Sequence, residues 1–166
     1  MMSYSLIFTL AFAAALVAGL LVKFWLATRQ VRHVARHGGA VPAAFASTIT
    51  LAAHQKAADY TIAKARFGLV EMAWGAALLL GWTLLGGLDL LNKLLLVWLG
   101  GGMVQQLALL AAFAVIGGLL ELPFTLWQTF RLEERFGFNK MTWKLWLADS
   151  VKGLVLGAAI GLPIAP

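Results

Sequence analysis

Residues 5–27 read SLIFTLAFAAALVAGLLVKFWLA, an apolar run whose only charged residue is Lys23. An α-helix rises 1.5 Å per residue, so about 20 apolar residues are enough to cross the ~30 Å hydrocarbon core of a bilayer. A cleaved signal peptide would carry basic residues before a shorter apolar stretch. Here the basic residues follow the apolar stretch. The run therefore predicts a transmembrane helix that is retained in the protein.

The composition extends this prediction to the whole chain. Hydrophobic residues make up 61% of the sequence and charged residues 12%, about half the charged fraction of a typical soluble domain. So much apolar surface cannot be hidden in one core of this size, so the bilayer must act as part of the solvent. We expect an all-α, polytopic helical bundle that forms a single membrane domain over residues 1–166, with about four spans at 5–27, 67–88, 103–120 and 147–166.

The last apolar run, Val151–Pro166, is shorter than the others. Its length corresponds to about 24 Å of helix, less than the ~30 Å that a span needs. We therefore expect either that this helix begins further back, near Trp146, or that the sequence stops inside a membrane segment.

The basic residues predict an orientation in the membrane. Residues 28–66 contain six Lys or Arg and one acid, residues 89–102 contain one Lys, and residues 122–150 contain four Lys or Arg. Cytoplasmic loops carry the excess of Lys and Arg. We expect loops 28–66 and 121–150 to be cytoplasmic and the N-terminus to be outside, in an integral protein of the bacterial inner membrane. Because the cations flank apolar runs, the net charge of +6 does not indicate nucleic-acid binding.

Local signals predict where helices begin and end. Gly38 and Gly39 break the chain, and Pro42 suits the first turn of a new helix. The third span is expected to close at Glu121 and Pro123. Beyond it we expect a helix, a turn at Gly137 and a second helix that starts near Thr142.

No complete catalytic or metal site is recognisable. The chain has no cysteine, which excludes disulfides, thiolate metal sites and a cysteine nucleophile. His33 and His37 are four residues apart and could share a helical face, but the zinc motif H-E-x-x-H requires a glutamate where this chain has Val34. With His54, they are interpreted as part of a basic surface beside the membrane, and a metal-binding pair is the alternative. No nucleophile has a recognisable base partner. We predict no catalytic and no metal-binding residue.

Two acids and three glycines occupy positions in or beside the apolar spans that suggest a role. Glu71 and Glu121 lie close to apolar spans, where a carboxylate is costly and is a candidate functional group. They could instead lie at the headgroups or pair with nearby basic residues.

Small residues four apart allow two membrane helices to approach closely. This spacing predicts packing of Gly153, Gly157 and Gly161 against a neighbouring helix, for which the surface at Gly117 and Gly118 is a candidate.

The segment 122–153 is the most distinctive part of the chain, and it resembles the N-terminal membrane domain of the type I CAAX prenyl proteases. That family has a "Leu-Pro-Phe … Phe … Glu-Glu … Gly-Phe-Asn-Lys … Thr" stretch before an "Asp … Lys-Gly" step into the next membrane helix. The matching residues here are Leu122, Pro123, Phe124, Phe130, Glu133, Glu134, Gly137, Phe138, Asn139, Lys140, Thr142, Asp149, Lys152 and Gly153. The first loop is similar too, with matches at Arg29, Gln30, His33, Val41, Pro42, Phe45, Lys56, Ala57, Asp59, Tyr60 and Lys64.

The resemblance implies a function for a larger enzyme. Members of this family are zinc endopeptidases whose zinc is bound by H-E-x-x-H and a later glutamate, on helices that follow the region seen here. The resemblance therefore implies zinc for the full-length protein, a downstream catalytic domain as partner, and a peptide or lipidated protein as substrate. The family motif is expected to form a cytoplasmic collar near the active site, with Glu133, Glu134, Gly137, Phe138, Asn139, Lys140, Thr142 and Asp149. The alternative is a standalone helical membrane protein that binds a partner or transports a solute.

Overall fold

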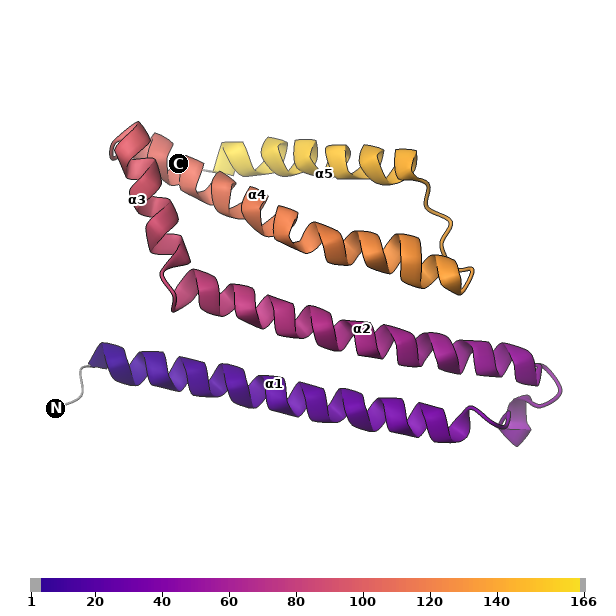
Figure 1. Ribbon diagram of the computed structural model, residues 1–166. Coiled ribbons are helices and arrows are strands. Elements are labelled where there is room, and N and C mark those ends of the chain that lie inside the picture. Colours follow the sequence, from indigo (N-terminus) through magenta and orange to yellow (C-terminus); the bar gives the residue numbers. More distant parts are fainter. Residues whose placement is uncertain (1–3, 165–166) are drawn as a thin grey trace. The chain divides into compact units, whose positions relative to one another are not determined.

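The computed structural model describes residues 4–164, with side chains described for Tyr4, residues 6–157 and residue 159. Helices account for nearly all of this range, and no strand occurs in it, which confirms the all-α prediction. Figure 1 shows the order of the elements along the chain. They are helix α1 (Tyr4–His37), the 3-10 turn η1 (Ala43–Phe45), α2 (Leu51–Thr83), α3 (Gly87–Leu99), α4 (Met103–Trp127), the π-helix η2 (Gln128–Glu133) and α5 (Trp143–Ile164).

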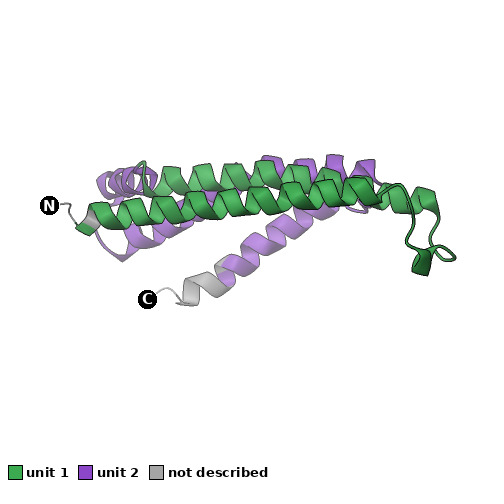
Figure 2. Cartoon of the chain, turned by 90° about the horizontal axis from the view of Figure 1, so that it is seen from below, with its two compact units in different colours: residues 1–85 green, residues 86–166 purple. Residues whose placement is uncertain are grey.

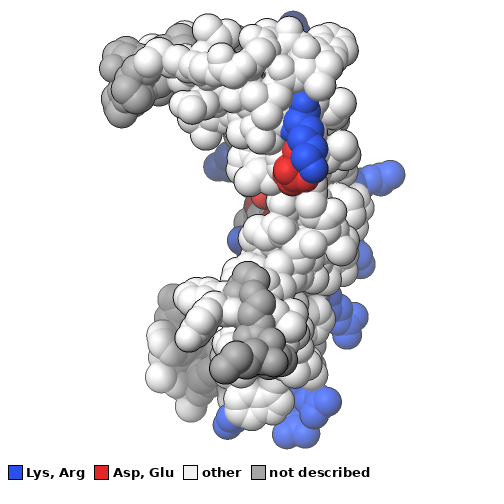
Figure 3. Space-filling model, turned by 90° about the vertical axis from the view of Figure 1, so that its left-hand side faces the viewer, with Lys and Arg blue, Asp and Glu red and all other residues white. Residues whose placement is uncertain are grey.

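The membrane character of the chain is confirmed by the lengths of its helices. In the described part, the segments Leu6–His37 and Met103–Glu133 are long and apolar enough to cross a membrane, and α2 with α3 adds a third if the pair counts as one span. Uncharged atoms cover most of the face shown in Figure 3. Large apolar side chains such as Phe8, Leu21 and Trp25 are exposed in the isolated chain. Lipid is the solvent in which such a surface is stable.

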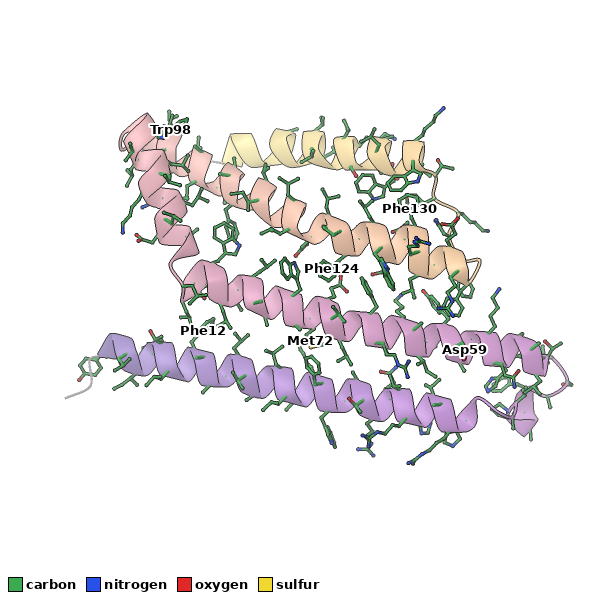
Figure 4. The ribbon with its side chains drawn as sticks, viewed as in Figure 1. Phe12, Asp59, Met72, Trp98, Phe124 and Phe130 are labelled. Carbon is green, nitrogen blue, oxygen red and sulfur yellow. The ribbon has the colours of Figure 1, made fainter. Side chains whose placement is uncertain are left out.

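The chain divides into two compact units, which Figure 2 colours separately. The first unit, residues 1–85, contains α1 and α2 side by side and antiparallel. Phe12 and Met72 lie between the two helices (Figure 4). The helices approach closely at Gly38, where an added Cβ would lie 3.3 Å from the Cβ of Ala58. Glycine at this position therefore permits the end of α1 to contact α2.

The helix ends of the first unit differ from the predicted ones. The prediction that Pro42 begins a helix is wrong: Pro42 precedes the short turn η1, and α2 begins at Leu51. Thr50 caps α2, because its Oγ1 accepts a hydrogen bond of 3.2 Å from the N–H of Ala53. α1 continues ten residues past the apolar run to His37, because residues 28–37 contain no glycine or proline. The basic residues thus mark the place where the helix passes from lipid into water, and not the end of the helix.

The second unit, residues 86–166, begins with α3 packed against α4. The two helices are joined by a turn at residues 100–102, with φ of +71° at Gly100 and +136° at Gly102. Between the two helices the side-chain amide of Gln105 donates a hydrogen bond of 2.7 Å to Oδ1 of Asn92. Gln105 is 5% exposed. The sequence analysis did not identify this buried polar pair.

The prediction that the third span closes at Glu121 and Pro123 is wrong. α4 continues through Pro123 to Trp127, and η2 extends the helical path to Glu133. Proline removes one backbone hydrogen bond and its ring opposes the carbonyl four residues earlier. Membrane helices tolerate proline because local changes of helical pitch satisfy the freed groups again. The carbonyl that Pro123 leaves without a backbone donor is that of Leu119, whereas the π-helical turn begins five residues after the proline, at Gln128.

We predict that replacing Gln105 by leucine destabilises the protein by about 1 kcal/mol, because the amide of Asn92 loses its partner in a part-buried position. The double variant Asn92→Leu/Gln105→Leu should recover part of this loss, since both polar groups are then removed. The measurement is thermal unfolding in detergent. Gln106→Leu is the matched control, because Gln106 is an exposed neighbour on the same helix. Equal melting temperatures for Gln105→Leu and Gln106→Leu would contradict this role of the pair.

Candidate functional site

The family-motif residues meet where η2 ends and the chain turns back toward α5. Gly137 has a φ of +72°, a conformation that only glycine adopts at little cost. Its N–H donates to the carbonyl of Glu134 at 2.9 Å, and the N–H of Phe138 donates to the carbonyl of Glu133 at 2.9 Å. These two bonds define a Schellman helix end, which satisfies carbonyls that the helix leaves open. The turn predicted at Gly137 is thereby confirmed.

Asn139 and Thr142 build the other half of this turn with their side chains. Oδ1 of Asn139 accepts a hydrogen bond of 2.7 Å from the N–H of Met141, a local bond for which asparagine is suited. Oγ1 of Thr142 accepts one of 3.3 Å from the N–H of Leu145. Thr142 thus acts as an N-terminal cap, and α5 begins at Trp143, as predicted. The spacing of this motif is accordingly explained by local backbone geometry.

Aromatic side chains hold the two arms of the turn together. The rings of Phe130 and Trp143 are stacked, with centroids 3.9 Å apart and an interplanar angle of 7°. Trp146 meets the edge of Trp143 at 6.4 Å. Phe130 lies between η2 and α5 (Figure 4), and Leu132 and Phe136 on the same turn are buried. The stacking of Phe130 on Trp143 was missed at the sequence level, although the density of aromatic residues in 127–146 was a signal for it.

The charged members of the motif remain available on the surface of the turn. Glu134 and Lys140 are exposed and Glu133 is half-buried. Within the described residues, none of the three forms an ion pair. Asp149 lies 4.0 Å from Lys152, and both side chains are largely exposed. The turn therefore presents two carboxylates and an ammonium group at its surface.

The three histidines come together at the end of the first unit. Nδ1 of His37 lies 2.8 Å from the carbonyl oxygen of His33, and Nε2 of His54 lies 3.1 Å from the carbonyl oxygen of His37. A carbonyl oxygen only accepts, so each of these nitrogens carries a proton and donates. The convergence of His54 with the other two was missed, because it depends on the antiparallel return of α2. Among the described residues, no group of three His, Cys, Asp or Glu side chains is arranged to hold a metal ion.

The remaining candidates are less closely surrounded. Glu71 and Glu121 are exposed, and neither forms an ion pair within the described residues. A Cβ added at Gly153 or Gly157 would meet no atom within 4 Å, and Gly117 and Gly118 are equally open. Gly161 lies outside the residues whose side chains are described. Packing of this glycine stripe against a neighbouring helix stays a prediction.

We predict that Gly137→Ala destabilises the protein by about 1–2 kcal/mol, because a side chain disfavours the left-handed conformation. Gly137→Asn should cost less, since asparagine tolerates this conformation. The measurement is thermal unfolding in detergent. Gly118→Ala is the control: it lies inside a helix with open space around its Cα, where alanine is the better helix former. If Gly137→Ala and Gly118→Ala shifted the melting temperature alike, the role of Gly137 would be refuted.

Comparison with curated proteins gives several relatives of one kind. Over 60 residues the chain is 45% identical to "CAAX prenyl protease 1" of Saccharomyces cerevisiae, a match that covers 36% of this chain and 13% of that protein. Over 111 residues it is 31% identical to "CAAX prenyl protease 1 homolog" of Caenorhabditis elegans, covering 67% of this chain and 24% of that protein. The matched segments thus make up less than a quarter of the length of these relatives.

A solved structure and a family model agree with these relatives. The crystal structure of Ste24p from S. mikatae matches with a TM-score of 0.82 and 30% identity, over 93% of this chain and 37% of that one. Residues 30–166 match the family model described as "CAAX prenyl protease N-terminal, five membrane helices". The resemblance read from the Gly137–Lys140 region is confirmed. With most of its length covered by that model, the chain belongs to the CAAX prenyl protease N-terminal family.

Proposed function

We propose that residues 1–166 act as one membrane domain, which forms part of the wall of a membrane chamber in a CAAX-protease-like zinc endopeptidase. The catalytic zinc would be bound by a segment of the protein outside these residues. The substrate would be a peptide or a lipidated protein, which the bilayer brings to the chamber in two dimensions. The observation that carries this proposal is the family match over residues 30–166.

The residues of the chain support a role in the chamber wall, with the zinc bound by another segment of the protein. Its described residues supply long apolar helices and a polar turn, but no donor set for zinc. A zinc peptidase needs three protein ligands and an open position for water, and a dry, shaped cavity around them. Long apolar helices can supply the walls of such a cavity. The turn of Glu133–Thr142 would then lie beside the active site as the collar.

One test addresses the chain itself. Metal analysis of the purified 166-residue polypeptide should find no stoichiometric zinc, and an assay with a prenylated peptide should find no cleavage. The protein that also contains the segment after Pro166 should hold one zinc per chain and cleave the peptide, with both properties abolished by a chelator. Tightly bound zinc in the short polypeptide would contradict the proposal. A reading frame without an H-E-x-x-H motif would favour the alternative of a standalone partner-binding or transport module.

A second test addresses the collar. In the full-length protein we expect Glu134→Gln and Asn139→Ala to lower the rate of proteolysis by about tenfold or more, because small displacements of substrate-positioning groups are costly. Lys144→Gln, an exposed change in the first turn of α5, should leave the rate unchanged. The melting temperature of each variant separates loss of activity from loss of fold. Unchanged proteolysis and stability in both collar variants would remove the collar from the proposal.

A third test addresses topology. We propose that the N-terminus is outside and that loops 28–66 and 121–150 are cytoplasmic, supported by their excess of Lys and Arg. Because the chain has no cysteine, single cysteines at Ala40, Gly101 and Lys140 can be labelled without background. A membrane-impermeant maleimide applied from outside should label the Gly101 variant alone. Labelling of the Ala40 or the Lys140 variant from outside would contradict this topology.

The kind of membrane is a separate part of the proposal. We propose the bacterial inner membrane, whereas the curated relatives described above come from a yeast and a nematode. This location stays a prediction, and fractionation of the native source would test it.

A further inference from the structure

Three arginines form a stripe along the last turns of α1. Arg29, Arg32 and Arg36 follow one another at spacings of three and four residues, which places them on one face of the helix. They line a hollow of about 450 Å³ together with four neighbours on the same helix: Trp25, Thr28, His33 and His37. In Figure 4, side chains with nitrogen at their tips project from this part of α1 on the side away from α2. We call Arg29, Arg32 and Arg36 the basic stripe.

The basic stripe has no protein counter-ion in the part of the chain that the structure describes. The ion pairs found there are Lys93 with Asp89 and Lys152 with Asp149. α1 itself contains no Asp or Glu. Asp59 of α2 lines a different hollow, next to Ala35 and Gly38. Like charges at these spacings repel and destabilise a helix, so an anion bound at the stripe would relieve that repulsion.

The sequence places the basic stripe at the depth of lipid phosphates. It follows directly on the apolar run of residues 5–27, within the candidate span Leu6–His37. The guanidinium of Arg29 lies 5.5 Å from the centre of the Trp25 ring, and tryptophan prefers the membrane–water interface. From Arg29 to Arg36 the helix rises about 10 Å, comparable with the headgroup layer of one leaflet. A soluble anion would not need this position beside the bilayer.

We propose that the basic stripe binds the phosphate of an anionic phospholipid. The guanidinium group matches two phosphate oxygens at once, which an ammonium group cannot do. A zwitterionic lipid carries the same phosphate but adds a cation that the three arginines repel. The stripe therefore selects anionic over zwitterionic headgroups. This inference depends on the stripe lying at the membrane surface and is independent of any proteolytic activity.

The test uses the detergent-solubilised protein with phosphatidylglycerol, phosphatidylcholine or inorganic phosphate as the added probe. Native mass spectrometry counts bound lipid, and thermal unfolding measures the stabilisation. Phosphatidylglycerol should bind and raise the melting temperature, whereas phosphatidylcholine and inorganic phosphate at the same concentration should not. Replacing all three arginines by glutamine should weaken phosphatidylglycerol binding on the order of 100-fold, because each cation near an anionic surface contributes several-fold.

Two control variants separate specific binding at the basic stripe from general attraction between charges. The triple change Lys140→Gln, Lys144→Gln and Lys152→Gln removes the same number of charges elsewhere and should leave lipid binding intact. The triple Arg→Lys variant of the stripe keeps the charge but loses the paired guanidinium contacts, and it should bind about tenfold more weakly. Melting without lipid shows that each variant is folded, and the single Arg32→Gln change serves if the triple change does not fold.

Three outcomes would overturn the proposal. The first is equally strong binding of phosphatidylglycerol by the wild type and by either stripe variant. Equal binding by the triple Arg→Lys variant would indicate diffuse attraction, because that needs only charge. The second is equal binding of phosphatidylcholine. The third is full protection by inorganic phosphate alone, which would indicate a site for a soluble anion.

Discussion

In the hydrocarbon of a bilayer, water is absent and each backbone N–H and C=O must find its partner within the protein. An α-helix meets this requirement segment by segment, so the long helices α1 and α4 can present apolar side chains outward on nearly every face. The same condition explains why α4 runs on through Pro123. A frayed end inside lipid would leave several carbonyls and N–H groups without partners, whereas a shift to π-helical pitch over Gln128–Glu133 leaves few.

Polar chemistry is therefore confined to places where the helices end or meet. In the first unit it gathers at the close of α1, where the side chain of His54 donates a hydrogen bond to the backbone carbonyl of His37 and the basic stripe has no counter-ion within the described residues. In the second unit it gathers at the Gly137 turn and at the buried pair of Asn92 and Gln105. Each cluster sits on a scaffold whose stability comes largely from helix hydrogen bonds and lipid.

This arrangement fits the proposed role of the domain as part of a chamber wall. The family motif is explained to a large extent by local geometry: Gly137 supplies a left-handed residue, Asn139 and Thr142 supply local hydrogen bonds, and Phe130 stacks on Trp143. A turn fixed in this way holds the backbone of Glu133 and Glu134 in a defined position. Rigid support of this kind is what a positioning surface in an enzyme requires.

The sequence by itself determined the helical class, the membrane environment, the turn at Gly137 and the start of α5, because apolar length, glycine and capping residues act within one or two helical turns. It misjudged Pro42, because the residues after it form only a 3-10 turn before α2 begins at Leu51. It misjudged Pro123 as a helix end, because the helical hydrogen bonds on either side of this proline continue α4 through it. The tertiary structure alone decided which distant residues meet. His54 reaches His37, Gln105 reaches Asn92 and Trp143 covers Phe130. These contacts depend on how helices return and pack, and no periodicity within a single helix encodes that.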